Sequence, residues 1–235
     1  MQATNIHFLI SCEHGGNRIP PRYRPMFEGY EHLLHSHRGY DSGALSMAKE
    51  LAMRLHSPLF AATTSRLLID LNRSIGHPRL YSEVTRHTPA AIRHEILKYY
   101  YLPYRTWVEA NIADAIRSGL RVIHISSHSF TPELNGEVRN TDIGLLYDPS
   151  RPLEQELCNR WRTCLAAHVR DLRVRRNYPY TGSANGFPTY LRRRFPANAY
   201  VGIELEVNQK HILKGGWRWH ALRSLLAGTL NEAVA

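Results

Sequence analysis

The chain has 235 residues, of which 43% are hydrophobic and 21% are charged, values typical of a globular protein. No apolar run approaches the ~18–20 residues of a membrane-spanning helix, and the N-terminus lacks the pattern of a signal peptide. Three scattered cysteines exclude a disulfide framework, so we expect a cytoplasmic protein without membrane association. We expect residues 1–235 to form a single domain.

The patterns of apolar residues predict strands that alternate with helices. Such alternation indicates an α/β sandwich with a central mixed sheet, in which long loops beyond the strand ends build the sites. The longest loops are expected at 72–88, 130–141 and 175–199. In chain order, we expect a strand at 6–11, a helix at 41–56, a strand at 58–65, one or two helices within 89–118, strands at 121–129 and 142–148, a helix at 153–169, a strand at 200–208 and a helix at about 215–233.

The net charge of +10 comes mostly from arginine and raises the question of an anionic partner. The densest basic groups, at 173–177 and 192–194, are accompanied by no helix-turn-helix, zinc-finger or RNA-binding motif. We therefore do not expect a nucleic-acid partner, because a small anionic substrate explains the charge at least as well. A basic domain that binds a polyanion is the alternative outside the enzymes.

Polar side chains gather where the predicted strands end. His14 follows the first strand, His128 lies near the end of the strand at 121–129, and Glu204 interrupts an apolar strand. A charged glutamate inside such a strand is costly unless it is paired, hydrogen-bonded or beside a metal ion. Two histidines and one carboxylate are usual ligands of a catalytic zinc ion, and a nearby glutamate suits the general base. The residues therefore predict a site of His14, His128 and one carboxylate, with Glu204 as the base.

Ordinary structural roles explain several neighbouring polar residues. Asp41 is accounted for equally well as the N-cap of the helix at 41–56 and as a metal ligand. His124 is interpreted as a capping or surface residue, and Glu206 as a side chain that faces solvent or pairs with an arginine. The serines of "ISSHSF" suggest a Ser–His hydrolase, but no G-x-S-x-G motif accompanies them.

Six short motifs follow one another along residues 11–209: "CEHGGNRIP", "HRGYDSGA", "SRLLIDLNRS", "ISSHSF", "DIGLLYDPS" and "GIELEVNQ". In this order they resemble the successive signatures of the N-formylglutamate amidohydrolase family, which is itself similar to zinc carboxypeptidases and aspartoacylase. The resemblance implies a zinc-carboxypeptidase-like fold, a three-layer α/β sandwich with a central mixed, largely parallel sheet, and one zinc ion per chain held by His, a carboxylate and His.

The resemblance assigns His14 and His128 as the first and last zinc ligands, but the chain departs from the wider pattern at the middle one. Carboxypeptidase-like sites use H-x-x-E, and Asn17, a poor zinc ligand, stands at the position of that glutamate. The carboxylate must come from elsewhere. We favour Asp41, which opens a helix, over Glu13, which is adjacent to His14 on extended backbone.

The resemblance also implies roles in catalysis and substrate binding. Glu204 in "GIELE" is similar to the general base, and Arg66 resembles the arginine that polarises the scissile carbonyl and stabilises the oxyanion. Asn72 and Arg73 in "DLNR" resemble the pair that grips the substrate carboxylate, which suits the two parallel hydrogen bonds that a guanidinium offers.

The expected activity is zinc-dependent hydrolysis of the amide bond of a small anionic N-acyl amino acid, such as N-formyl-L-glutamate. The same ligands would serve a zinc carboxypeptidase or an amidase acting on a peptide or cell-wall fragment. The loop at 175–199 is expected to shape specificity, and Arg176 and Asn177 are our choices within it for substrate contacts.

Overall fold

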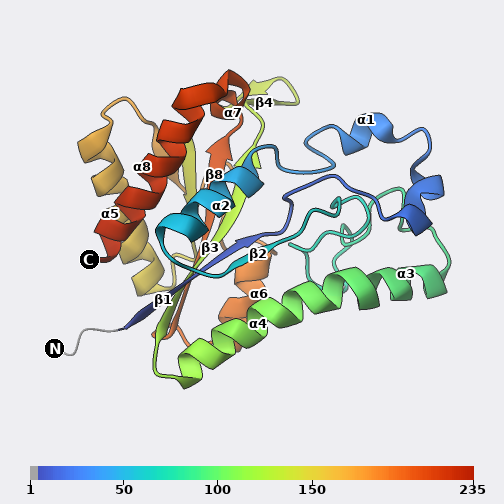
Figure 1. The fold of residues 1–235 in the computed structure, drawn as a ribbon, viewed down its shortest axis with the longest axis horizontal. Helices are drawn as coiled ribbons and strands as arrows, with labels where there is room; N and C mark the ends of the chain where they lie inside the picture. Colours follow the sequence, from blue (N-terminus) through green and yellow to red (C-terminus); the bar gives the residue numbers. More distant parts are fainter. Residues whose placement is uncertain (1–4) are drawn as a thin grey trace.

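A six-stranded mixed sheet forms the centre of the structure (Figure 1), and the computed structural model describes residues 5–235. Its strands are β1 (Ile6–Cys12), β2 (Leu59–Ala61), β3 (Arg121–Phe130), β6 (Ile143–Leu146), β7 (Val174–Arg176) and β8 (Tyr200–Asn208). The order is β2-β1-β3-β8-β6-β7, in which the first four strands are parallel and β6 runs antiparallel to β8. A separate hairpin pairs β4 (Glu133–Leu134) with β5 (Glu137–Val138).

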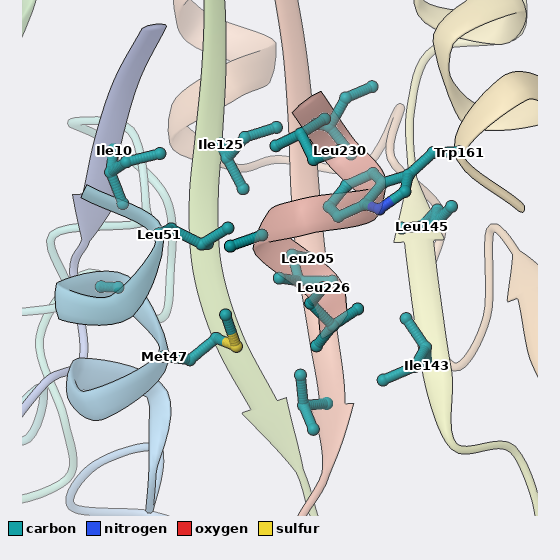
Figure 2. Close-up of a cluster of buried hydrophobic side chains, with 14 of the residues drawn as sticks. Ile10, Met47, Leu51, Ile125, Ile143, Leu145, Trp161, Leu205, Leu226 and Leu230 are labelled. Atoms are coloured by element: carbon teal, nitrogen blue, oxygen red, sulfur yellow. The ribbon is translucent and has the colours of Figure 1, made fainter. Parts of the chain in front are cut away.

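Helices cover both faces of this sheet, because alternate strand residues point to opposite sides. On one face, α2 (Ala44–Arg54), α5 (Pro152–His168) and α8 (Gly216–Val234) pack on the apolar cluster of Figure 2, which includes Ile10, Ile125 and Leu205. On the other face, α4 (Leu102–Arg117) and α6 (Phe187–Arg194) enclose Leu9, Val122 and Tyr200.

A second group of elements extends the molecule beyond the α4 face. An apolar cluster that includes Tyr23, Leu68 and Ile96 packs residues 21–27 against the loop that follows β2 and against residues 90–96. α4 is the continuation of a longer helical rod that passes through one π-helical turn. The elements are η1 (Pro21–Phe27), α1 (Glu31–Leu34), α3 (Ala90–Ile96) and the π-helical η2 (Leu97–Tyr101), while α7 (Lys210–Lys214) follows β8.

The chain order places a site where β1 and β3 end. β1 leads through α2 to β2 on one side, and the chain returns through α3 and α4 to β3 on the other side of β1. Open α/β sheets bind ligands at such a switch point, outside the carboxyl ends of the strands. His14 follows β1 and His128 lies near the end of β3, so both reach this point.

The predicted fold class, an α/β sandwich with a central mixed and largely parallel sheet, is confirmed. Some element bounds differ from the predictions. The helix predicted at 41–56 begins at Ala44, the strand predicted at 58–65 is the three-residue β2, and the loop predicted at 175–199 contains part of β7 and all of α6. α6 was hidden because turn-forming residues, including Gly186 and Pro188, surround its short apolar face.

Across residues 5–235, none of the helices combines the length and the apolar composition that crossing a bilayer requires.

Candidate metal centre

Three side chains meet at the carboxyl edge of the sheet in an arrangement suited to a metal ion. His14, Asp41 and His128 each offer one ligand atom, and these atoms lie within 4.8 Å of one another. All three residues are buried. The two imidazole rings are arranged edge to face, with centroids 5.1 Å apart. Two neutral imidazoles and one carboxylate are the donor set of catalytic zinc sites that leave a fourth position open.

His128 is held between two carboxylates. Its Nδ1 lies 2.8 Å from Asp41 Oδ2, and its Nε2 lies 3.1 Å from Glu13 Oε2. Ser126 Oγ donates a hydrogen bond of 2.6 Å to the same Glu13 oxygen, and the hydroxyl of Tyr104 donates to Glu13 Oε1 at 2.9 Å. Glu13 therefore orients the ring from the side opposite Asp41, in the manner of carboxylates that support metal-binding histidines.

His14 shows the same arrangement. Its Nε2 lies 2.7 Å from Asp70 Oδ1, while its Nδ1 lies 3.5 Å from Asp41 Oδ2. That Nδ1 is buried and makes no hydrogen bond to any described residue. A buried polar atom without a partner is costly, and a cation between His14, Asp41 and His128 would satisfy it. The residues present therefore fit a metal ion.

The position of Asp41 corrects one of its two predicted roles. α2 begins at Ala44 with Gly43 as its N-cap, and no side chain caps this helix end. The carboxylate of Asp41 is instead directed to His128 and, at 3.4 Å, to Arg66. Gly43 adopts a φ of 78°, which glycine tolerates and which lets the chain turn into the helix after Asp41.

The electrostatics of the cluster favour a positive charge at its centre. Although burial acts against it, hydrogen bonds and charges from Asp41 and Glu13 raise the pKa of His128 well above its usual value. Burial likewise opposes ionisation of Asp41, yet His14 and His128 lower its pKa. The negative charge that favours a proton on His128 also favours a metal cation at the same point.

A pocket of about 320 Å³ opens over this cluster. Its walls come from the ends of β3 and β8, from the segment after β2 and from the segment before α6. The volume suits a small molecule. The lining residues are His14, His37, Asp41, Arg66, Asn72, Arg73, His77, Arg79, His128, Ser129, Phe130, Thr131, Leu134, Tyr180, Thr181, Ala184, Asn185, Glu204 and Glu206.

Glu204 lies on the wall of this pocket, on the same face of the sheet as His128. Burial raises its pKa, and the charges of His128 and Arg192 act in the opposite direction. A Cβ atom added to Gly186 would lie 2.9 Å from Glu204 Oε1 and 3.3 Å from Asn72 Oδ1. Gly186 has extended backbone, so its lack of a side chain provides space for the carboxylate rather than backbone freedom.

Glu206 lies two residues further along β8 and corrects a prediction. It neither faces solvent nor pairs with an arginine: it is 5% exposed, lines the pocket and forms no salt bridge with any described residue. Its Oε2 is buried without a hydrogen-bond partner among residues 5–235. Burial raises the pKa of Glu206 to about 8, and the negative charges of Asp41 and Glu204 add to this effect.

The two predicted pocket arginines are already tied to the protein. Arg66 Nη2 lies 2.9 Å from Asp70 Oδ2, and its Nη1 lies 3.4 Å from Asp41 Oδ1. Arg73 donates from Nη1 to the carbonyl of Asn185, and its Nε is 3.9 Å from Asp70 Oδ2. Asn72 Oδ1 accepts a hydrogen bond of 2.6 Å from the backbone N–H of Phe187. These bonds hold the segment before α6 against the pocket.

Arg176 and Asn177 are not among the residues that line the pocket, and their contacts with substrate stay a prediction. Arg176 is exposed and donates to the side chain of Asn159 at 2.7 Å. Asn177 Oδ1 accepts hydrogen bonds of 3.0 Å from the backbone N–H groups of Tyr147 and Gly182. Asn177 thus shapes the turn that carries Tyr180 to the pocket.

Sequence reasoning missed the supporting residues. Glu13 was weighed only as an alternative ligand, although its place on the same face as Ser11 and Leu9 was a usable signal, since alternation directs it under the neighbouring strand. The bond between Asp70 and His14 joins segments 56 residues apart in sequence. Local patterns carry no signal for such a contact.

The sequence profile of the N-formylglutamate amidohydrolase family matches residues 6–213. The chain belongs to the N-formylglutamate amidohydrolase family. No curated protein sequence matches it. The gene product Atu2144 from Agrobacterium tumefaciens is similar over 98% of this chain and 91% of its own, with 26% identity and a TM-score of 0.83. N-formylglutamate amidohydrolase from Ralstonia eutropha JMP134 is similar over 99% of this chain and 94% of its own, with 18% identity and a TM-score of 0.70.

A metallo-carboxypeptidase from Pseudomonas aeruginosa is a more distant match, with 15% identity and a TM-score of 0.42, over 100% of this chain and 59% of its own. The protein is thus a member of the N-formylglutamate amidohydrolase family with a buried His–Asp–His cluster that can bind a metal ion.

Proposed function

We propose that the protein is a zinc-dependent amidohydrolase that cleaves the amide bond of a small N-formyl or N-acyl amino acid, of which N-formyl-L-glutamate is an example. The observation that carries this proposal is the convergence of His14, Asp41 and His128 with a free, buried Nδ1 on His14. Family membership supports amide hydrolysis. Imidazole and carboxylate donors suit zinc, so His14, Asp41 and His128 would hold one ion per chain.

When bound, zinc would lower the pKa of a coordinated water and polarise the amide carbonyl. Glu204 is then the base: its carboxylate lines the pocket, accepts a proton from the attacking water and returns it to the nitrogen of the leaving amine. Gly186, which has no side chain, leaves room for that carboxylate beside Asn72. Burial raises the pKa of Glu204, which brings its proton affinity closer to that needed near neutral pH.

Arg66 and Arg73 line the same pocket and supply positive charge to it. Arg66 is fixed by Asp70 and Asp41, so its guanidinium is already oriented to stabilise negative charge on the carbonyl oxygen. Arg73 and Asn72 also hold the segment before α6, and we propose that Arg73 contacts the substrate carboxylate from this wall. Two free cysteines, Cys12 and Cys158, are buried, which fits the cytoplasmic setting that we propose.

A peptide or cell-wall fragment as substrate is the second enzymatic candidate, and the pocket of about 320 Å³ favours a smaller ligand over a long chain. A polyanion-binding role has less support. Arg192, the first residue of the densest arginine run, is buried in an ion pair of 2.9 Å with Glu154, and Arg194 pairs with Glu109 at 2.8 Å. Arg192 therefore serves the fold, and the charge of the exposed Arg194 is balanced by Glu109.

The test combines elemental analysis with turnover of N-formyl amino acids. We expect about one zinc per chain in the wild type, and Glu204→Gln to keep that zinc while kcat falls by roughly 10²–10⁴-fold, the range for loss of a general base. Glu156→Gln, an exposed change on α5, is the matched control and should retain both. Normal turnover in Glu204→Gln would remove Glu204 as the base. A wild type that binds no zinc would overturn the proposed function.

A further inference from the structure

One buried arginine next to the pocket wall has no part in the proposed chemistry. Arg105, in the first turn of α4, is 5% exposed and is not among the residues that line the pocket. It forms no salt bridge with any residue from 5 to 235, and its buried Nη2 has no hydrogen-bond partner there. A buried charge without a charged partner is costly, so the contacts that Arg105 does make should explain its presence.

The hydrogen bonds of Arg105 reach the segment that carries Asn72 and Arg73. Its Nη1 donates to the backbone carbonyl of Leu71 at 3.0 Å and to that of Arg73 at 3.4 Å. The hydroxyl of Tyr101 donates to the same Arg73 carbonyl at 2.7 Å. Two side chains of the helical rod therefore hold the carbonyl groups on either side of Asn72, and the charged donor makes the stronger kind of hydrogen bond.

Aromatic rings also hold the guanidinium of Arg105 in place. Its Cζ lies 4.1 Å from the ring centroid of Phe187, 4.4 Å from that of Tyr190 and 5.1 Å from that of Tyr101. A guanidinium over aromatic rings is attracted to them and is restricted in orientation. The backbone N–H of Phe187 donates in turn to Asn72 Oδ1 at 2.6 Å. Arg105 thus contacts both segments that meet at Asn72, the one after β2 and the start of α6.

The side chains carried by this segment are those that bind the substrate carboxylate in the proposed function. Asn72 and Arg73 line the pocket, whereas Arg105 reaches only their backbone. A carboxylate is bound through paired hydrogen bonds only where the donors are correctly placed, so a small shift of this backbone would weaken the contact. The geometry gives Arg105 a means of acting on substrate binding without touching the substrate.

We propose that Arg105 is a positioning residue, which holds the backbone of residues 71–73 so that the side chains of Asn72 and Arg73 meet the substrate carboxylate. The inference rests on the proposed function, because it requires the carboxylate-binding role of Arg73. The metal ligands and Glu204 make no contact with Arg105 through the hydrogen bonds described above. Its loss should therefore weaken binding and spare the chemical step, so that KM rises while kcat changes little.

Steady-state kinetics of the zinc-loaded protein with N-formyl-L-glutamate tests this role. We expect Arg105→Met to raise KM by roughly 10-fold or more, the factor expected when a hydrogen bond from a charged donor to the substrate is lost. Zinc content and kcat should stay near those of wild type. Tyr101→Phe removes only the second donor to the Arg73 carbonyl and should raise KM by a smaller factor.

Tyr190→Phe is the matched control for Tyr101→Phe. The ring next to Arg105 stays, and the hydroxyl that is lost donates to Glu109, not to the pocket wall. KM should therefore equal that of wild type.

A double-mutant cycle separates positioning from a general loss of structure. If Arg105 acts through Arg73, Arg105→Met should change KM much less in an Arg73→Ala background, because the group that it positions is gone. An equal factor in both backgrounds would overturn the inference, and so would an unchanged KM in folded Arg105→Met. Should Arg105→Met fail to fold, Tyr101→Phe decides in the same cycle by the same two criteria.

Failure of the proposed function would give a distinct result. If the zinc-loaded wild type hydrolyses no N-formyl amino acid, the proposed function fails, and calorimetry with N-formyl-L-glutamate tests the positioning role alone. Binding that is weaker in Arg105→Met and Tyr101→Phe than in Tyr190→Phe would support it. Equal binding by all of these proteins, or no binding by the wild type, would refute it.

Discussion

Two buried histidines on β3, four residues apart and on the same face of the sheet, have opposite surroundings. The ring nitrogens of His124 lie 2.7 Å from Ser11 Oγ and 2.7 Å from the hydroxyl of Tyr200. Those of His128 face the carboxylates of Asp41 and Glu13. Burial lowers the pKa of His124 to about 4, whereas the carboxylates raise that of His128.

The comparison shows that partners, not burial or strand position, separate a structural histidine from a candidate ligand. Hydroxyl groups can donate to one nitrogen and accept from the other, so they complete a neutral imidazole without adding charge. Carboxylates accept only, and they leave a site that favours a cation. His124 therefore belongs to the packing between β1 and β8, and His128 belongs to the candidate metal centre.

The largest expected difference between the surroundings of His128 and those of His124 is their effect on metal binding. We expect Asp41→Asn to weaken zinc binding by more than the roughly 10–100-fold that follows the loss of a supporting group, because it removes a charged ligand. His124→Gln should leave zinc content near that of wild type. Elemental analysis after dialysis against a weak chelator measures both. Zinc retained in Asp41→Asn would exclude Asp41 as a ligand.

A smaller effect is expected from the carboxylate behind His128. Glu13→Gln keeps the shape of the side chain but removes the negative charge that orients Nε2, so zinc affinity should fall by about 10–100-fold. Glu156→Gln, which removes the same charge from an exposed site on α5, serves as the control and should not change that affinity. Competition titration with a zinc-binding dye gives the two dissociation constants. Equal constants in Glu13→Gln and wild type would contradict the supporting role.

More of the fold than of the candidate site could be predicted from the sequence. Alternating apolar patterns located the central strands, because alternate residues of β3 and β8, such as Ile123, Ile125, Ile203 and Leu205, fill the core on one face of the sheet. The motif "HRGYDSGA" made Asp41 a candidate ligand, but its position at the start of a predicted helix explained it equally well as an N-cap. Only tertiary structure places its carboxylate beside a histidine 87 residues away. The surroundings of Glu206 were mispredicted for the same reason, since contacts between segments distant in sequence leave no local pattern.

The smallest effect concerns the pH dependence of stability. His124 has a folded pKa of about 4, below the value of about 6.5 for an unfolded histidine, so the unfolded chain binds the extra proton between these pH values. The free energy of unfolding contributed by His124 is therefore complete above pH ~6.5 and declines as the pH falls toward 4. Between pH 6 and 5, wild type should lose about 1 kcal/mol more than His124→Gln.

Urea denaturation of metal-free wild type and His124→Gln at the two pH values measures this difference. Ser11→Ala leaves the imidazole in place and should retain most of the wild-type slope. If wild type and His124→Gln lose stability equally between pH 6 and 5, His124 is not held neutral in the folded chain, and its contrast with His128 fails.

The three candidate ligands come from segments that are distant in sequence, with His14 after β1, Asp41 before α2 and His128 near the end of β3. No short part of the unfolded chain offers the same set, so an ion bound here is linked thermodynamically to folding. At a free zinc concentration 100 times the dissociation constant, this linkage adds about 2.7 kcal/mol to the free energy of unfolding. The melting temperature of this protein should therefore rise with the availability of its metal, and metal supply would control its abundance as well as its activity.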